Sequence, residues 1–239
     1  MSFREAPMAD PAPRAVLFDF DGTLADSYPA ITASVNHVRG LHGLPPLGVA
    51  EVRRHVGRGA PYLLAHTVGS DDADADLAAY KAHHPSVLRS GTTLLPGAAA
   101  AAAALAGRGV RLGVCSNKPV AFTRELLALL GLEGRFAVAL GPEDVARPKP
   151  APDMLLAALA RLDVTPPEAL YVGDMTVDVE TARAVGVAVW VVPTGSDTAD
   201  ALRRAGPDRL LRDLHELTVL LASEGGGREG PGAGPSPSG

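Results

Sequence analysis

The sequence is poor in cysteine and in aromatic residues. Its single cysteine, Cys115, excludes a disulfide within the chain and fits a reducing compartment. Only 4% of the 239 residues are aromatic, so alanine, valine and leucine must supply most of the packing. Because 46% of the residues are hydrophobic, the chain can nevertheless bury a substantial core.

Long apolar runs and clusters of basic residues are also missing. No stretch approaches the ~20 apolar residues of a membrane span. The net charge is −5 and the pI is near 5.8, and no Lys/Arg cluster is dense enough for nucleic acid or an anionic membrane. Residues 1–13 lack the basic end and apolar centre of a secretory signal. We therefore expect a cytoplasmic protein, monomer or homodimer, without a nucleic-acid or membrane partner.

What the sequence does contain is an alternation of apolar strands and helices. Such an alternation predicts a parallel sheet covered on both faces, with strands at residues 15–18, 110–115, 136–140, 169–172 and 187–192. Residues 28–90 show helical periodicity and no convincing strand, which predicts a helical insertion. The expected fold class is therefore α/β, a doubly wound parallel sheet with a small inserted α-helical domain.

The predicted boundaries divide the chain into four parts. Residues 1–13 carry three prolines and few large apolar side chains, which predicts a disordered arm. Residues 14–27 and 91–222 form the α/β core, and residues 28–90 form the helical insertion. Residues 223–239 are rich in Gly, Pro and Ser, which predicts a disordered tail.

Polar residues collect where the predicted strands end. In a doubly wound sheet, ligands bind beyond the carboxyl ends of the strands. The polar residues in these places are Asp19, Asp21, Ser116, Asn117, Asp174 and, one helical turn later, Asp178. Lys149 lies between two prolines, which hold its backbone extended just before a helix. Because an unpaired buried carboxylate is costly, we expect a divalent metal to bind among these acids.

Each of these residues has a simpler structural explanation when it is taken alone. Ser116 or Asn117 would cap a helix, and Lys149 would be a solvated loop charge. Asp174 and Asp178 would be acids at a helix start. Their common order at the strand ends favours a functional site instead.

Cys115 and the pair His83-His84 have no such support. Cys115 is expected to be a small buried strand residue, because no activating cation adjoins it in the sequence. The two histidines lie in a polar helical stretch, so we expect both of them on the solvated surface and not at a metal.

The sequence Asp-Phe-Asp-Gly-Thr-Leu at residues 19–24, directly after an apolar strand, resembles the nucleophile motif of the haloacid dehalogenase (HAD)-like phosphohydrolases. Three further motifs follow in the family order, and the resemblance covers residues 14–222. It implies a HAD-like Rossmannoid core and a Mg²⁺-dependent phosphatase that acts through an aspartyl-phosphate.

The resemblance also implies roles for individual residues. Asp19 is the nucleophile, Asp21 is the general acid/base, and Lys149 is the cation that neutralises nucleophile and phosphate together. Ser116 binds the transferring phosphoryl oxygens, with Asn117 beside it. The implied Mg²⁺ ligands are Asp19, the main-chain carbonyl of Asp21, Asp174 and Asp178.

Three stretches, residues 55–60, 114–119 and 206–208, give a finer resemblance to the phosphoglycolate phosphatases. This resemblance implies 2-phosphoglycolate, a small phosphorylated metabolite, as the substrate and a helical cap over the site. Arg58 is flanked by two glycines and is expected to grip the substrate carboxylate. The sequence departs from the subfamily at Ser116, where threonine is frequent, and at Arg58, where another polar residue often stands.

Other activities share the four motifs. Sugar-phosphate phosphatases, nucleotidases, pyrophosphatases and a hexose-phosphate mutase all carry them. Receiver domains of signalling proteins also place acids, a Ser/Thr and a Lys at the strand ends of such a sheet. A receiver domain would leave the helical insertion and Asp178 unexplained, so a phosphatase is the preferred interpretation.

Overall fold

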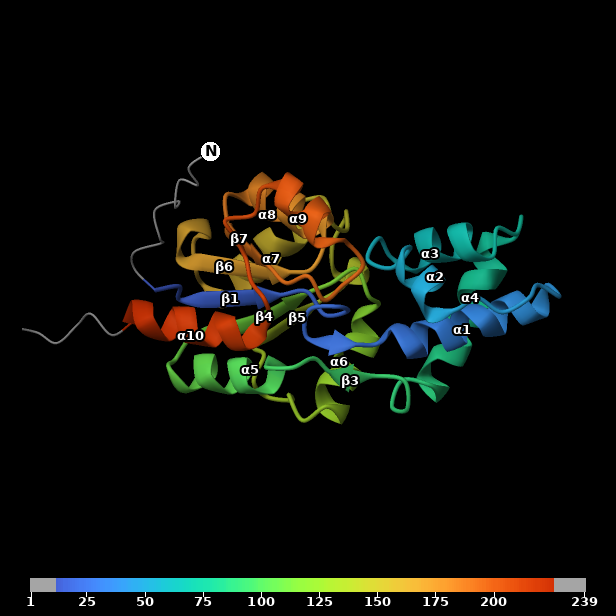
Figure 1. Cartoon of the computed structure of the whole chain (residues 1–239), viewed down its shortest axis with the longest axis horizontal. Coiled ribbons are helices and arrows are strands. Elements are labelled where there is room, and N and C mark those ends of the chain that lie inside the picture. The colour runs from blue at the N-terminus through green and yellow to red at the C-terminus, as the bar shows by residue number, and fades with distance from the viewer. Residues whose placement is uncertain (1–11, 226–239) are drawn as a thin grey trace, which may run out of the picture.

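The computed structural model describes residues 12–225, in which a sheet-containing part and a helical part lie side by side (Figure 1). All but the last two residues of the predicted arm at 1–13 fall outside the described residues, as do positions 226–239 of the predicted tail. Helix α10 (Leu214–Gly225) runs to the last described residue, past the predicted boundary at residue 222. The predicted disorder of the tail stays a prediction. Within residues 12–225, no helix is long and apolar enough to cross a bilayer.

Six strands form one sheet in which every pairing is parallel. The order is β5-β4-β1-β6-β7-β8, so the chain extends the sheet first to one side of β1 and then to the other. The strands are β1 (Ala15–Phe18), β4 (Arg111–Cys115), β5 (Val138–Leu140), β6 (Ala169–Gly173), β7 (Ala188–Val191) and β8 (Arg209–Leu210). The predicted doubly wound α/β sheet is confirmed.

Helices cover both faces of the sheet because successive strand side chains point to opposite faces. In β1, Val16 and Phe18 pack into one hydrophobic layer, and Ala15 and Leu17 pack into the other. The first layer includes α10 and two further helices, α5 (Ala98–Gly107) and α6 (Val120–Leu129). The second layer includes α7 (Asp153–Leu162), α8 (Thr176–Val185) and α9 (Ala199–Ala205). Figure 1 shows α8 and α9 above the sheet and α5 and α10 below it.

Helix α9 is absent from the sequence-based prediction. It is short and polar, and of its residues only Leu202 is buried. A local signal was nevertheless present, because Thr198 caps the helix through its hydroxyl and Gly206 ends it in the left-handed conformation.

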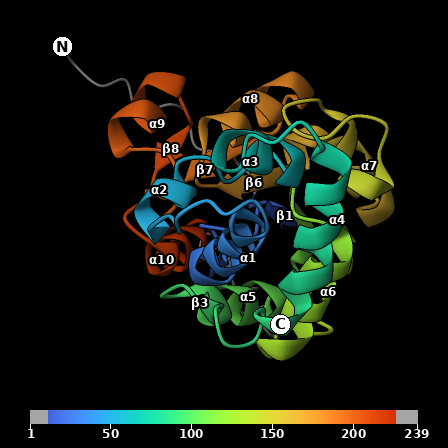
Figure 2. The ribbon, with the colours of Figure 1, turned by 90° about the vertical axis from the view of Figure 1, so that its right-hand side faces the viewer.

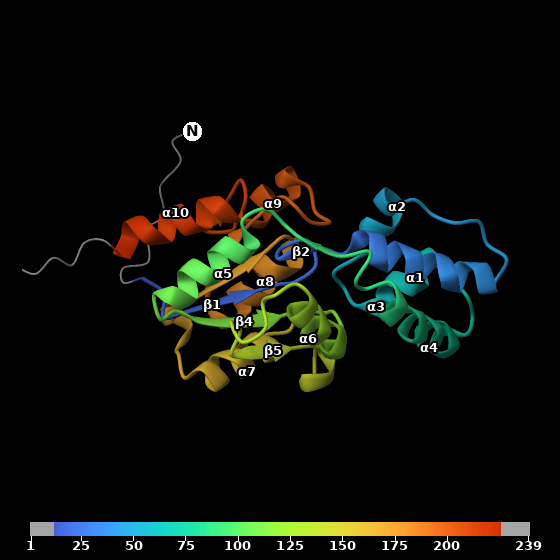
Figure 3. The ribbon, with the colours of Figure 1, turned by 90° about the horizontal axis from the view of Figure 1, so that it is seen from below.

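The helical part, residues 28–90, has a hydrophobic core of its own, to which Val35, Val38, Val52 and Leu64 contribute. Its helices are α1 (Tyr28–Leu41), α2 (Val49–Arg53), α3 (Ala60–Thr67) and α4 (Ala73–His83), followed by the 3₁₀ turn His84–Ser86. The chain enters and leaves this part through a short antiparallel pair, β2 (Ala25–Asp26) and β3 (Thr93–Leu94) (Figure 3).

His84 corrects one prediction, because it is completely buried and not on the solvated surface. Its Nδ1 lies 2.9 Å from the hydroxyl of Ser34, and its ring packs against the rings of Tyr80 and Phe122. Burial is the main cause that lowers the pKa of His84 to about 3, with a smaller contribution from the charge of Lys118. His84 is therefore uncharged at neutral pH.

The strand register brings the carboxyl ends of the central strands to one edge. Phe18 of β1 is paired with Val114 of β4 on one side and with Val172 of β6 on the other. The residues that follow these three strands therefore emerge at the same level. Figure 2, seen from the helical side, shows α1 to α4 in front of this edge.

Two glycines at the ends of α5 allow a matched test of how closely α5 and α10 pack. Gly97 and Gly109 both have positive φ, +86° and +76°. A Cβ at Gly97 would lie 2.6 Å from the backbone nitrogen of His215, whereas a Cβ at Gly109 would meet nothing within 4 Å. We expect Gly109→Ala to cost about 1 kcal/mol for the left-handed conformation. Gly97→Ala should cost about 1–3 kcal/mol more, because the backbone of α10 must move away.

Urea unfolding of the two variants measures this difference. Equal destabilisation by both substitutions would contradict the close approach of α5 and α10 at Gly97.

Candidate active site

Asp19 and Lys149 form an ion pair at the end of the central strand. The Asp19 amide donates to the carbonyl of Val172, which continues the strand pairing and directs the carboxylate beyond the sheet edge. Lys149 Nζ lies 3.0 Å from Asp19 Oδ1, and both side chains are almost fully buried. The angle of this contact is not that of a hydrogen bond, so Asp19 Oδ1 has no hydrogen-bond partner within residues 12–225. That oxygen remains free to coordinate a metal.

Lys149 is held by contacts at both ends of the residue. Its ammonium group donates to Asp178 Oδ1 at 2.7 Å and to the hydroxyl of Tyr171 at 2.9 Å. At its main chain, the N–H donates to Asn117 Oδ1, and the carbonyl accepts from Asn117 Nδ2, each at 3.0 Å. The position of the ammonium group is therefore set by both β6 and the residues after β4.

The Asn117 side chain binds main-chain groups on two segments, and the phosphate-binding role expected for this residue stays a prediction. Besides Lys149, its Nδ2 donates to the carbonyl of Gly57 at 3.1 Å. Its amide is thus engaged with the main chain of Lys149 and of the helical part. The structure favours a role for Asn117 in joining these two segments.

Three buried carboxylates, Asp19, Asp174 and Asp178, form a cluster that fits a divalent cation. One oxygen of each lies within 4.8 Å of the others. Burial, together with the charges of Asp19 and Asp178, raises the pKa of Asp174 well above its usual range. Burial by itself would lower the pKa of Lys149. The neighbouring Asp178 and Asp19 carboxylates outweigh the effect of burial and raise that pKa. One ammonium group for three carboxylates leaves an excess of negative charge, which a hard divalent cation would neutralise.

Hydrogen bonds orient the two later acids. Asp174 accepts from the Thr23 hydroxyl at 2.8 Å and from the Ser196 N–H at 3.2 Å. Asp178 accepts from two main-chain N–H groups, those of Asp174 and Met175, through its Oδ2. These contacts point both carboxylates toward Asp19.

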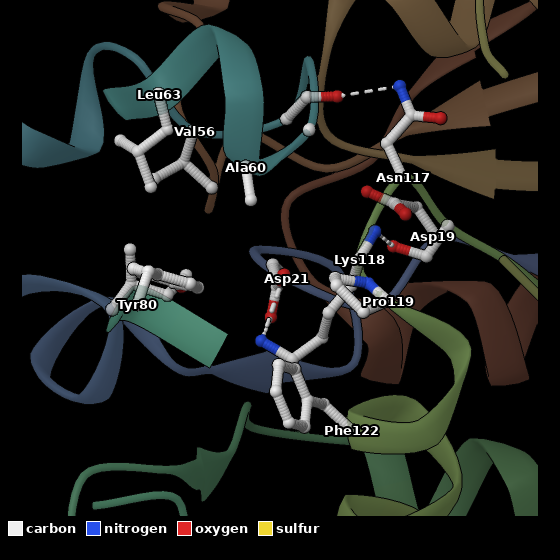
Figure 4. A pocket seen from close by; sticks show the side chains of 14 residues that line it. Asp19, Asp21, Val56, Ala60, Leu63, Tyr80, Asn117, Lys118, Pro119 and Phe122 are labelled. Atoms are coloured by element: carbon white, nitrogen blue, oxygen red, sulfur yellow. Dashed lines mark hydrogen bonds and ion pairs between the residues drawn. The ribbon is translucent and has the colours of Figure 1, made fainter. Parts of the chain in front are cut away.

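Asp21 lines a pocket together with Asp19 (Figure 4). Its Oδ1 accepts from the Ser27 hydroxyl and from Lys118 Nζ, the latter at 3.1 Å. Lys118 Nζ also lies 3.3 Å from Asp21 Oδ2. The side chains of Lys118 and Asp21 are only 3% and 10% exposed, so the pair is nearly dry.

The pocket lies between the strand ends and the helical part. Its polar wall consists of Asp19, Asp21, Ser116, Asn117 and Lys118. Its apolar wall is formed mainly by Ile31, Val56, Leu63, Tyr80 and Phe122. The cavity measures about 30 Å³, which is room for two or three waters at about 10–15 Å³ each.

Arg58 does not line this pocket, unlike Gly57 and Gly59 on either side of it. It is exposed, and its guanidinium group lies 5.5 Å from the ring centroid of Tyr62. Arg58 therefore does not face this pocket in the present arrangement, and its contact with a substrate stays a prediction.

Another arginine of the helical part, Arg53, does reach the sheet-containing part. Its Nε donates to the carbonyl of Gly195 at 2.9 Å, and its terminal nitrogen donates to the carbonyl of Thr194. The guanidinium group also covers the ring of Tyr28. Arg53 therefore ties α2 to the loop that contacts Asp174.

The structure brings together all the expected core residues and adds others that the sequence analysis missed. The missed residues that contact the expected ones are Thr23, Ser27, Lys118 and Tyr171. Signals for them existed in the sequence. Lys118 directly follows Ser116-Asn117, and Tyr171 is the only residue of the β6 strand with a polar side chain.

Tyr171 links three parts of the site through one hydroxyl. It contacts Lys149 Nζ and Asp178 Oδ1, and it lies 2.9 Å from the carbonyl of Cys115. Tyr171→Phe leaves these buried groups short of a partner, so we expect a loss of about 1–3 kcal/mol in the free energy of unfolding. Tyr62→Phe is the matched control, because no hydrogen bond of the Tyr62 hydroxyl occurs within residues 12–225. It should change the stability by less than about 0.5 kcal/mol.

Urea unfolding with a constant m-value measures both effects. A Tyr171→Phe protein as stable as the control would show that the hydroxyl is not needed to satisfy the Lys149 ammonium group.

The geometry of the site agrees with the known proteins that this chain resembles. The family described as haloacid dehalogenase-like hydrolase matches residues 16–192. A phosphoglycolate phosphatase of Rhodospirillum rubrum is 43% identical over 194 residues, which are 77% of this chain and 80% of that protein. A phosphoglycolate phosphatase of Escherichia coli strain K12 is 31% identical over 232 residues, which are 87% of this chain and 92% of that protein.

A solved structure has the same fold. The crystal structure of a predicted phosphoglycolate phosphatase from Haemophilus somnus has a TM-score of 0.83 at 23% identity, with 88% of this chain and 99% of that chain covered. The family match spans most of the described residues and includes both the nucleophile motif and the Asp174 region. The chain therefore belongs to the haloacid dehalogenase-like hydrolases.

Proposed function

We propose that this protein is a Mg²⁺-dependent phosphatase that hydrolyses a small phosphate monoester, 2-phosphoglycolate, through an aspartyl-phosphate on Asp19. The observation that carries the proposal is the buried Asp19, placed between a lysine and two further carboxylates at the edge of a pocket. Membership of the family removes the receiver-domain alternative.

Asp19 is the nucleophile in this proposal. A carboxylate oxygen forms a bond to phosphorus while the bond between phosphorus and the ester oxygen breaks. The like charges of carboxylate and phosphate repel by about 4 kcal/mol at 4 Å in an effective dielectric of about 20. Lys149, 3.0 Å from Asp19, offsets this repulsion. Bound by Asp19, Asp174, Asp178 and the carbonyl of Asp21, Mg²⁺ would supply Lewis-acid stabilisation of the phosphoryl oxygens.

Ser116 is suited to hold the phosphoryl group. It is buried, it lines the pocket, and its Oγ accepts from the Lys118 N–H at 3.3 Å. Because that hydroxyl oxygen already accepts a hydrogen bond, its own proton is free to be donated to a phosphoryl oxygen. Ser116 therefore orients the group that Asp19 attacks.

Asp21 serves as the acid and then as the base. It faces the pocket beside Asp19, where the ester oxygen would leave. In the first step it gives a proton to that oxygen. In the second it takes a proton from the water that attacks phosphorus, while the bond between phosphorus and the Asp19 oxygen breaks and phosphate is released. Ser27 and Lys118 keep the carboxylate in place through both steps.

The helical part acts as a cap in this proposal. It closes the pocket to about 30 Å³, so a substrate can enter only when the cap moves away. Two cap–core contacts, Arg53 with Gly195 and Asn117 with Gly57, hold the closed arrangement. Closure excludes bulk water and so strengthens the electrostatic interactions at Asp19.

The choice of 2-phosphoglycolate is supported by the names of the relatives. A cationic side chain, Lys118, also lines the pocket and suits a substrate that carries a carboxylate. The cytoplasmic location and the monomeric or homodimeric state stay predictions.

Asp19→Asn tests the nucleophile. The amide cannot form the covalent intermediate, so we expect turnover to fall by about three orders of magnitude or more with the fold retained. Asp163→Asn is the matched control, because the Asp163 side chain is 97% exposed and far from the site. Initial rates of phosphate release should be measured on 2-phosphoglycolate, a sugar phosphate, a nucleoside monophosphate, pyrophosphate and ethyl phosphate. Undiminished turnover by Asp19→Asn would refute Asp19 as the nucleophile. A tenfold preference for another ester would refute 2-phosphoglycolate as the substrate.

The metal site has a test that does not depend on activity. For protein stripped of metal, Mg²⁺ at about 100 times its Kd should stabilise the fold by about 2.7 kcal/mol, because it binds the folded state only. For a chain of this size, the Tm should rise by about 5–10 °C. Asp174→Asn should abolish the rise, whereas Asp163→Asn should keep it. A rise of the same size in Asp174→Asn would place the cation elsewhere.

A further inference from the structure

Lys118 differs from Lys149 in how its charge is used. The Lys149 ammonium group contacts Asp19, Asp178 and the Tyr171 hydroxyl. The Lys118 ammonium group, in contrast, contacts only the two oxygens of Asp21 among residues 12–225, at 3.1 and 3.3 Å. An ammonium group has three donors, so Lys118 retains capacity for another acceptor although its side chain is only 3% exposed.

The surroundings of this ammonium group are apolar. Figure 4 shows it at the Asp21 end of the pocket, on the side of Tyr80 and Phe122. The titratable group behind these two rings, His84, is uncharged, because burial lowers its pKa to about 3. A cation in such an environment interacts strongly with a second anion, since little water screens it.

No other cation competes for this place in the described part of the chain. Lys118 is the one positively charged residue that lines the pocket. Arg58 lies outside it over Tyr62, and Arg53 is engaged with main-chain carbonyls. An anionic group of a substrate other than its phosphate would therefore find its cationic partner in Lys118.

The spacing suits one kind of substrate. Asp21 must reach the ester oxygen that leaves, and Lys118 Nζ lies one hydrogen-bond length from Asp21. In 2-phosphoglycolate, the carboxylate carbon is two covalent bonds from the ester oxygen. A carboxylate this close to the oxygen next to Asp21 is within reach of the Lys118 ammonium group.

We propose that Lys118, and not Arg58, binds the substrate carboxylate and so selects phosphate monoesters with a carboxylate one carbon from the ester oxygen. This inference rests on the proposed phosphatase function. It assigns Lys118 a second role besides its contact with Asp21: the ammonium group donates one hydrogen bond to Asp21 and another to the substrate.

A competing explanation is that Lys118 serves only as the counter-ion of Asp21. In that case, loss of the charge would slow the hydrolysis of every ester equally. Ser27 provides a matched control, because its hydroxyl contacts the same carboxylate of Asp21 and carries no charge.

The experiment compares kcat/KM on 2-phosphoglycolate with kcat/KM on ethyl phosphate, which lacks the carboxylate. In Lys118→Met, we expect the ratio of the two values to fall ten- to a hundredfold, about the effect of one charge-assisted hydrogen bond, with most of the change in KM. Lys118→Gln, which keeps a hydrogen-bond donor for Asp21, should show a similar fall if Lys118→Met does not fold. Ser27→Ala should lower both values together and leave the ratio unchanged.

An unchanged ratio in both Lys118 variants would overturn the inference. A similar fall of the ratio in Arg58→Ala, with no fall in the Lys118 variants, would return the role to Arg58. The inference concerns the ratio of kcat/KM on 2-phosphoglycolate to kcat/KM on ethyl phosphate, so it can be tested even if the wild type prefers a third ester. Such a preference would refute only 2-phosphoglycolate as the substrate.

Calorimetry separates the inference from the phosphatase proposal. If the wild-type protein turns over no ester, the proposed function fails. The affinities for 2-phosphoglycolate and ethyl phosphate, measured in the presence of Mg²⁺, still allow the ratio to be compared between the wild type and Lys118→Met, in which it should fall. An equal preference of both proteins for 2-phosphoglycolate would then reject Lys118 as the carboxylate-binding residue.

Discussion

The excess of buried negative charge around Asp19 is the constraint on which the rest of the structure depends. Three carboxylates converge there against one ammonium group, that of Lys149. Such an arrangement is costly without a cation, so the fold must hold the acids together against their repulsion. The Tyr171 hydroxyl and main-chain N–H groups do so from within the sheet and at the start of α8. The proposed Mg²⁺ would relieve the repulsion that the fold otherwise has to overcome.

The parallel sheet supplies the rigid frame for this convergence. Three neighbouring strands, β4, β1 and β6, end at one level, and each is packed on both faces by helices. The acids are therefore attached to the most buried strands of the protein. The helical part adds what the sheet cannot provide, a second wall and the exclusion of water. Its contacts with the core arise from Arg53 and from the carbonyl of Gly57.

The pocket divides its work between two lysines. Lys149 lies among the carboxylates and neutralises them, whereas Lys118 lies beside Asp21 and faces the space left for the alcohol part of a substrate. In the proposed function, this division lets one site hold a phosphate and still distinguish what is esterified to it. We infer that the substrate-reading role that the sequence suggested for Arg58 belongs to a residue of the core, Lys118. The cap then contributes shape, through Val56 and Leu63, more than charge.

The sequence by itself determined the α/β class, the helical insertion and the residues around Asp19, because apolar periodicity and the short motifs at strand ends are local signals. Only the tertiary structure decided that His84 is buried, that the Asn117 amide binds main chain, and that Lys118 enters the pocket. The polar stretch around His84 gives no sign that Tyr80 and Phe122 cover it. The physical reason is that these outcomes depend on contacts between segments far apart in the chain. Local sequence sets the type of each side chain, whereas the packing of those segments sets its partners.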